Sequence, residues 1–144
     1  MVVCSDISFL FSLYGNDIHT PSAIEWIRLN RDAILISRFN YFELINALRF
    51  AEFRKTIATG NSEIFASQFR YDLCGGRIIA RNCDLADILS EADRLSLVYT
   101  LRGGHRAFDI LHVAAARIIG ASHFLTFDAN QKKLATNEGL IVPL

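Results

Sequence analysis

The sequence predicts an α/β fold in which helices surround a central, mostly parallel sheet. Short β-like runs alternate with helical patterns along the 144 residues, which is typical of crossover units around a parallel sheet. The hydrophobic content of 51% argues against disorder and favours a largely buried sheet. No internal repeat or Pro/Gly-rich linker divides the chain, so we expect one domain over residues 1–144.

Five short apolar runs have the character of strands. The last of them, LIVPL, is expected at the sheet edge, because Pro143 has no N–H to donate to a neighbouring strand. The expected strands, in chain order, are residues 1–4, 33–37, 77–80, 123–127 and 140–144.

The segments between the runs have apolar residues at helical spacing. The expected helices, in chain order, are residues 7–14, 22–30, 39–55, 61–75, 84–100, 108–119 and 129–137. Their N-terminal signals are Thr20 with Pro21, Asn61 with Ser62, and Asp84. Their C-terminal signals are the glycines Gly75, Gly76, Gly103, Gly104 and Gly120.

Charge, cysteines and hydropathy exclude several classes of protein. Fifteen basic residues balance fifteen acidic ones. This balance disfavours a protein that coats DNA non-specifically, but not an enzyme that binds a short segment of RNA. Three cysteines without CxxC spacing are expected to be reduced thiols rather than a disulfide framework or zinc site. No apolar run approaches the ~20 residues that span a membrane, and no signal peptide is recognisable. We therefore expect a cytoplasmic protein with no membrane partner.

Four acidic residues occupy related places in the expected fold. Asp6 directly follows the first strand and Asp128 the fourth, whereas Asp109 lies in the first turn of a helix. Glu43 lies one to two turns into the helix that follows the second strand. Because ligands of parallel sheets bind at the carboxyl ends of the strands, we expect these acids to face one crevice. Helix capping for Asp6 and Asp109, and an ordinary helix-surface role for Glu43, are the alternatives.

A cluster of acids needs a cation, because adjacent carboxylates otherwise repel and one becomes protonated. Oxygen ligands without a His or Cys cluster suit Mg²⁺ or Mn²⁺ better than zinc. A hard divalent ion beside a crevice favours phosphate chemistry. The sequence has neither GxxxxGK[ST] nor a GxGxxG after a strand, which excludes the common nucleotide-binding loops.

Four segments, in this order, make the chain resemble the PIN-domain family and its VapC-type toxin ribonucleases: CSDISFL, SRFNYFELINALR, RAFDILHVAAA and FLTFDANQKKLA. The resemblance implies a three-layer α/β/α sandwich and a metal-dependent endoribonuclease whose products carry 5′-phosphate and 3′-hydroxyl ends. It implies that the catalytic ligands of Mg²⁺ or Mn²⁺ are Asp6, Glu43 and Asp109, completed or supported by Asp128.

The resemblance also implies supporting roles for two hydroxyl residues. Ser8 and Thr126 match positions that line the site in the family. One departure is Ile7, which occupies a position where the family often has Thr. His112 lies three residues after Asp109 and could be taken for a metal ligand. A hydrogen-bonded, half-buried structural histidine is the favoured interpretation, because its neighbours are Leu, Val and Ala.

Basic residues indicate an RNA partner, and the resemblance implies protein partners. The candidate RNA contacts, with a solvated surface as the alternative, are Arg38, Arg102, His105 and Arg106. The resemblance implies a homodimer and the toxin of a type II toxin–antitoxin pair, neutralised by a cognate antitoxin protein. The alternatives are a non-catalytic PIN-like module that binds RNA or protein, and a PIN nuclease of RNA processing without an antitoxin.

Overall fold

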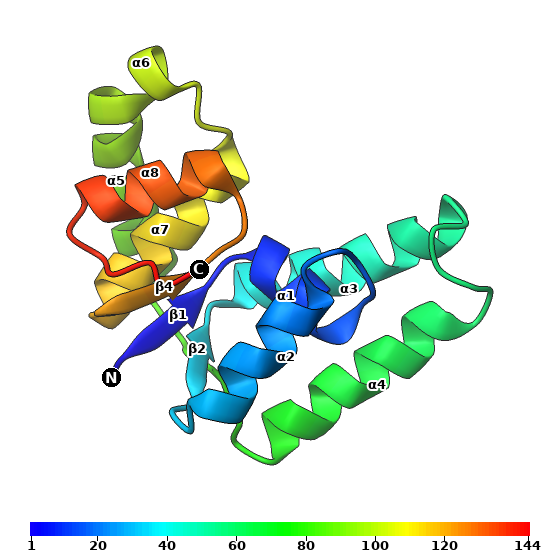
Figure 1. Cartoon of the computed structure of the whole chain (residues 1–144). Coiled ribbons are helices and arrows are strands. Elements are labelled where there is room, and N and C mark those ends of the chain that lie inside the picture. Colours follow the sequence, from blue (N-terminus) through cyan, green and yellow to red (C-terminus); the bar gives the residue numbers. More distant parts are fainter.

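Four strands of three residues each form one parallel sheet in the computed structural model, which describes residues 1–144 (Figure 1). The spatial order is β3-β2-β1-β4, and every neighbouring pair is parallel. The predicted α/β class is therefore confirmed. The strands are β1 (Val3–Ser5), β2 (Ile34–Ile36), β3 (Ile78–Ala80) and β4 (His123–Leu125).

Helices fill every connection between strands. After β1 come α1 (Ile7–Tyr14) and α2 (Thr20–Leu29), and after β2 come α3 (Arg38–Phe53) and α4 (Asn61–Cys74). The connection from β3 to β4 contains α5 (Leu85–Leu95), a π-helical turn (Ser96–Thr100), α6 (Leu101–Gly103) and α7 (Ala107–Ile119). The helix α8 (Ala129–Asn137) follows β4. No helix is both long and apolar enough to cross a membrane.

The sheet separates two hydrophobic cores. In β1, Val3 packs into a first core, which is shared with α1 to α4, whereas Cys4 packs into a second core, which is shared with α5, α7 and α8. In β4, Leu125 packs into the first core and Phe124 into the second. Successive strand residues point to opposite faces, so a sheet covered on both sides needs consecutive apolar residues. The three-layer α/β/α sandwich is thus confirmed (Figure 1).

The strand order reverses between β1 and β4. From β1 the chain moves outward to β2 and then β3 through helices of the first core. It then returns along the opposite face, through α5 and α7, to place β4 on the other side of β1. In open α/β sheets, such a switch point leaves a ligand crevice beyond the carboxyl ends of the strands. Asp6 and Thr126 follow the two strands that flank this point.

The predicted edge strand at residues 140–144 is wrong. Only Ile141 forms a bridge, parallel to His123, with hydrogen bonds from Phe124 N to Ile141 O (2.9 Å) and from Ile141 N to Ser122 O (3.0 Å). The pairing does not extend because Pro143 has no N–H to donate.

Several predicted boundaries also move. The expected helix 84–100 becomes α5 followed by the π-helical turn, although Asp84 caps it as predicted. Thr20 and Asn61 are first helical residues rather than N-caps, and the caps before them are His19 and Gly60. Gly60 has φ +87°, a conformation that glycine adopts without steric cost.

Candidate active site

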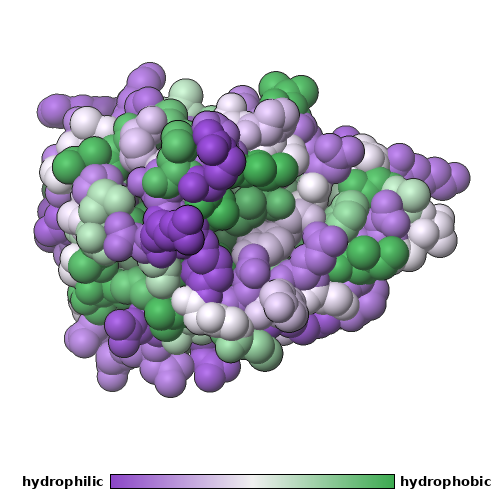
Figure 2. Space-filling view, turned by 60° about the horizontal axis from the view of Figure 1, so that its bottom comes forward, coloured by the Kyte–Doolittle hydropathy of each residue, from purple (hydrophilic) through white to green (hydrophobic).

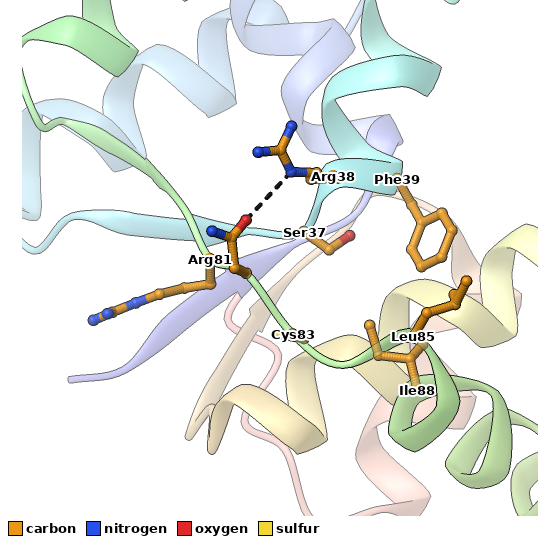
Figure 3. Close-up of a pocket in the computed structure, with 8 residues that line it drawn as sticks. Ser37, Arg38, Phe39, Arg81, Cys83, Leu85 and Ile88 are labelled. Carbon is orange, nitrogen blue, oxygen red and sulfur yellow. Dashed lines mark hydrogen bonds between the residues drawn. The ribbon is translucent and has the colours of Figure 1, made fainter.

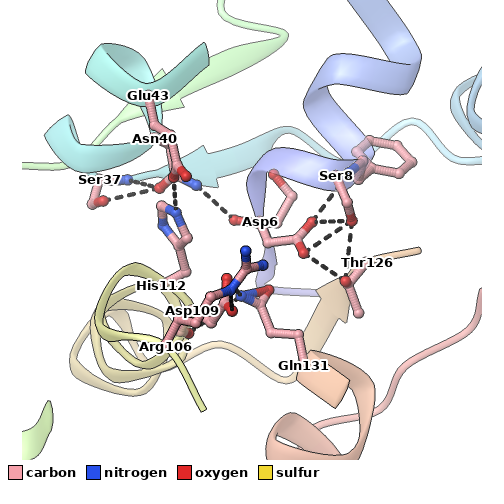
Figure 4. Close-up of polar contacts among 12 residues, drawn as sticks. Asp6, Ser8, Ser37, Asn40, Glu43, Arg106, Asp109, His112, Thr126 and Gln131 are labelled. Atoms are coloured by element: carbon pink, nitrogen blue, oxygen red, sulfur yellow. Dashed lines mark hydrogen bonds and ion pairs between the residues drawn. The ribbon is translucent and has the colours of Figure 1, made fainter. Parts of the chain in front are cut away.

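Asp6, Glu43, Asp109 and Asp128 line a single cavity of about 340 Å³. Asp6 and Asp128 lie just beyond β1 and β4, Glu43 lies on α3, and Asp109 lies in the first turn of α7. The acids thus come from four separate parts of the chain. We call this cavity the acidic pocket (Figure 4).

Asp6 is both a helix cap and a buried member of the acidic pocket. Its carboxylate accepts hydrogen bonds from Phe9 N (3.1 Å), from Ser8 Oγ (2.7 and 2.9 Å) and from Thr126 Oγ1 (2.6 Å). Its own N–H donates to Leu125 O at 3.1 Å, which continues the pairing of β1 with β4. Thr126 therefore reaches Asp6 because the two strands end side by side.

Burial, rather than repulsion by other acids, dominates the protonation of Asp6. The residue is 2% exposed, and this desolvation raises its carboxyl pKa from 3.8 to about 6. Hydrogen bonds from Thr126, Phe9 and Ser8, and the charge of His112, act in the opposite direction. The expected mutual repulsion of the carboxylates is not among the causes of this shift.

Glu43 is oriented by a histidine. His112 Nε2 hydrogen-bonds Glu43 Oε2, and the imidazole is 2% exposed, so His112 is more deeply buried than the half-buried residue that we expected. His112 Nδ1 has no hydrogen-bond partner. Figure 4 shows the imidazole rising from α7 toward Glu43 on α3. The spacing of three residues from Asp109 correctly places His112 on the pocket side of α7.

Asp109 and Asp128 share Gln131 as a neighbour. Asp109 Oδ2 accepts from Arg106 Nε at 3.0 Å, and Gln131 Nε2 donates to Asp109 Oδ1 and O at 3.3 Å each. Asp128 caps α8 by accepting from Gln131 N at 2.8 Å. Gln131 is 1% exposed, and its Oε1 has no hydrogen-bond partner. Sequence reasoning did not single out Gln131, although a Gln three residues after an N-cap is a recognised signal.

A second residue that sequence reasoning missed connects β1 to α3. Asn40 is 2% exposed, accepts from Ser37 N at 2.9 Å and donates to Ser5 O at 2.9 Å. It thereby fixes the start of α3 relative to the residue that precedes Asp6.

The four basic candidates do not converge on the acidic pocket. Arg106 lines it, whereas Arg38 lines a neighbouring cavity. His105 is only 9% exposed and its Nδ1 lies 3.2 Å from Asn130 Nδ2. Arg102 is exposed on α6 and does not line the acidic pocket.

The chemistry of the pocket fits a hard divalent ion. As the side chains lie, no three His, Cys, Asp or Glu residues are close enough to hold a metal together. Figure 4 shows why: Asp6 turns toward Ser8 and Thr126, whereas Glu43 turns toward His112. Nevertheless, the lining has four carboxylates, Arg106 as its one guanidinium, and the unpartnered Oε1 of Gln131. An oxygen-rich donor set with excess negative charge is suited to Mg²⁺ or Mn²⁺.

Comparison with known proteins places this arrangement in a family. The family model described as PIN domain matches residues 3–137. A search of curated proteins finds no match. Among solved structures, VapC20 of Mycobacterium tuberculosis, described as a sarcin–ricin loop cleaving toxin, superposes with a TM-score of 0.71 at 15% identity over 96% of each chain. At that identity the superposition supports the fold. The chain belongs to the PIN domain family.

Proposed function

We propose that this chain is a Mg²⁺- or Mn²⁺-dependent endoribonuclease and the toxin of a type II toxin–antitoxin pair. The observation that carries the proposal is the convergence of four carboxylates on one pocket at the switch point of the sheet. Membership of the PIN domain family, and a fold neighbour that is an RNA-cleaving toxin, support the same activity.

Asp6, Glu43 and Asp109 would hold the ion, with Asp128 completing the set. When bound, such an ion lowers the pKa of water and stabilises negative charge that develops on a phosphodiester and its leaving oxygen. The chain's own part is orientation: Ser8 and Thr126 fix the Asp6 carboxylate through three bonds of 2.6 to 2.9 Å. His112 does the same for Glu43.

Arg106 is the basic residue best placed to meet the substrate. It lines the acidic pocket, and its side chain is 80% exposed while that of its partner Asp109 is 20% exposed. An exposed ion pair of this kind is weak, so the guanidinium can exchange Asp109 for a phosphate at little cost. Arginine also binds phosphate through two parallel hydrogen bonds.

A protein partner is the second part of the proposal. Large apolar side chains on α3 and α4 are exposed, and they include Phe42, Phe50, Phe53, Ile64 and Tyr71. Figure 2 shows apolar surface groups on one face of the molecule, separated by hydrophilic residues. Exposed aromatic groups with a polar surround are typical of protein interaction sites. We propose that the protein is cytoplasmic and uses such surfaces to bind its antitoxin and a second copy of itself.

The test of the activity is Asp109→Asn. The variant should abolish Mg²⁺-dependent cleavage of RNA and the growth arrest caused by expression. Asp93→Asn is the matched control, because Asp93 is an exposed acid of α5 outside the acidic pocket. If Asp109→Asn cleaves RNA as fast as the wild type, the catalytic assignment is wrong.

Metal binding can be tested without activity. Mn²⁺ added to the wild type should raise its melting temperature, because a ligand that binds only the folded state stabilises it. Asp109→Asn should show a smaller rise and Asp93→Asn the full rise. No rise in the wild type would instead support the non-catalytic binding module.

A further inference from the structure

A second cavity, of about 260 Å³, lies beyond the carboxyl ends of the strands, as the acidic pocket does. Ser37 directly follows β2 and Arg81 directly follows β3, as Asp6 follows β1. We call this second cavity the flanking pocket (Figure 3). Its lining includes Ser37, Arg38, Phe39, Arg81, Asn82 and Leu85.

The flanking pocket has the opposite electrostatic character to the acidic pocket. Two arginines and no acidic residue line it, and Phe39, Leu85 and Ile88 supply an apolar wall. Figure 3 shows those three side chains gathered on one side, with Arg38 on the other and Arg81 extending outward. Such a lining suits a ligand with an apolar, planar part and a negative charge.

Arg38 is held in place by the neighbouring loop. Its Nε donates to Asn82 Oδ1 at 3.3 Å, which ties the start of α3 to the segment after β3. This bond uses Nε only, so the two terminal amino groups of the guanidinium remain for a ligand. No carboxylate pairs with Arg38 in an ion pair.

The two pockets are adjacent. Phe39, on the wall of the flanking pocket, packs edge-to-face on Phe108, with ring centroids 6.3 Å apart and an interplanar angle of 85°. Phe108 lines the acidic pocket. The pockets are thus separated by one aromatic pair, and a single strand can pass from one to the other over it.

We infer that the flanking pocket binds the base of a nucleotide next to the cleaved phosphodiester in single-stranded RNA, an inference that rests on the proposed function. Proteins recognise unpaired RNA bases by stacking them on aromatic rings or guanidinium planes, and they bind the connecting phosphates with arginine. Phe39 and Arg38 provide these groups on opposite sides of the cavity. Its volume is below the ~300 Å³ at which pockets for drug-sized ligands begin, so it suits one base rather than a larger group.

Leu85→Glu tests the inference without altering the acidic pocket. Leu85 is 55% exposed and is the first residue of α5, where a carboxylate is favourable for the helix, so the variant should fold. Leu89→Glu is the matched control, because Leu89 is 51% exposed on the same helix but does not line the cavity. Binding of a short fluorescein-labelled single-stranded RNA is measured by anisotropy in EDTA. We expect Leu85→Glu to weaken binding about tenfold or more and Leu89→Glu to leave it unchanged.

Arg38→Gln provides a second, independent measurement. Removing one phosphate contact to a single strand should reduce the slope of log K against log salt concentration by about 0.7. Arg49→Gln, an exposed arginine of the same helix that does not line either pocket, should leave the slope unchanged.

The outcomes separate the flanking pocket from the nuclease activity. Equal binding by Leu85→Glu and Leu89→Glu, or no binding of this RNA by the wild type, overturns the inference. The same assay is run with a fluorescein-labelled acidic peptide. If Leu85→Glu weakens the binding of that peptide and leaves RNA binding unaffected, the inference is overturned in favour of a protein ligand. If the wild type cleaves no RNA while Leu85→Glu alone loses RNA binding, the proposed function fails and the flanking pocket stands.

Discussion

Replacing the buried carboxylate of Asp6 by a neutral amide should stabilise the protein. Asp6 is 2% exposed, and its pKa is raised from 3.8 to about 6. That shift means that the ionised carboxylate costs the folded protein about 3 kcal/mol at neutral pH. Asn has the same shape and can still accept from Phe9 N and Ser8 Oγ. We therefore expect Asp6→Asn to raise the free energy of unfolding by up to about 3 kcal/mol at about pH 7, while abolishing cleavage.

The sign of the pH dependence follows from the raised pKa. Below 3.8 the carboxyl is protonated in both the folded and the unfolded chain, so its favourable contribution is fully present. As the pH rises through about 6, the folded protein must ionise Asp6, and that contribution is lost. The gain from Asp6→Asn should accordingly shrink toward zero at about pH 4.

The assay is urea unfolding in EDTA, followed by the fluorescence of Trp26, the single tryptophan, which is 8% exposed in the first core. Asp93→Asn should show no comparable gain. A variant Asp6→Asn that is less stable than the wild type at about pH 7 would refute the reasoning. An equal gain at about pH 4 and pH 7 would refute it as well.

Three further predictions concern other parts of the chain. Thr126→Val removes the hydroxyl that donates to Asp6 at 2.6 Å, and it should lower the rate of cleavage about 10- to 100-fold in a single-turnover assay while the fold, followed by circular dichroism, is retained. Glu91→Gln removes a carboxylate whose pKa is lowered to about 2 by Arg94 and also by Arg117. The stabilisation by ionised Glu91 is fully present above pH 4.5 and is lost as the pH falls through about 2. In urea unfolding at neutral pH the variant should therefore be about 1 kcal/mol less stable than the wild type. Its free energy of unfolding should also fall less steeply as the pH is lowered. Phe69→Ala opens a cavity in the first core, where Phe69 is fully buried, and should cost about 3–5 kcal/mol in urea unfolding.

Local patterns predict the elements well where caps and periodicity agree. The sequence predicts α8 at residues 129–137, as observed, because Asp128 is an N-cap signal and the residues after it have helical spacing. The strands are shorter than predicted because polar residues at their ends bond elsewhere. Ser37 Oγ donates to Asn40 and starts α3, and Thr126 Oγ1 donates to Asp6. Propensity alone cannot distinguish these residues from strand residues.

The convergence of the four acids can be predicted, because ligands of parallel sheets bind beyond the carboxyl ends of the strands. The hydrogen-bond partners of each acid cannot be predicted in this way. His112 and Glu43 are 69 positions apart, and their contact depends on how α3 and α7 are rotated against each other. Arg38 and Glu43 lie on the same helix, α3. Five residues along a helix correspond to about 140° of rotation, so Arg38 faces the flanking pocket whereas Glu43 faces the acidic pocket.

The three-residue strands link the accuracy of folding to the proposed activity. In β1, Val3 and Cys4 enter opposite cores, and Asp6 follows after one more residue. A slip of β1 by one position against β4 would exchange these two side chains between the cores and move Asp6 about 3.3 Å away from the Thr126 hydroxyl. Chains with the wrong register therefore lose packing and the acidic pocket together. Specific activity in a refolded preparation should report directly the fraction of molecules with native strand register.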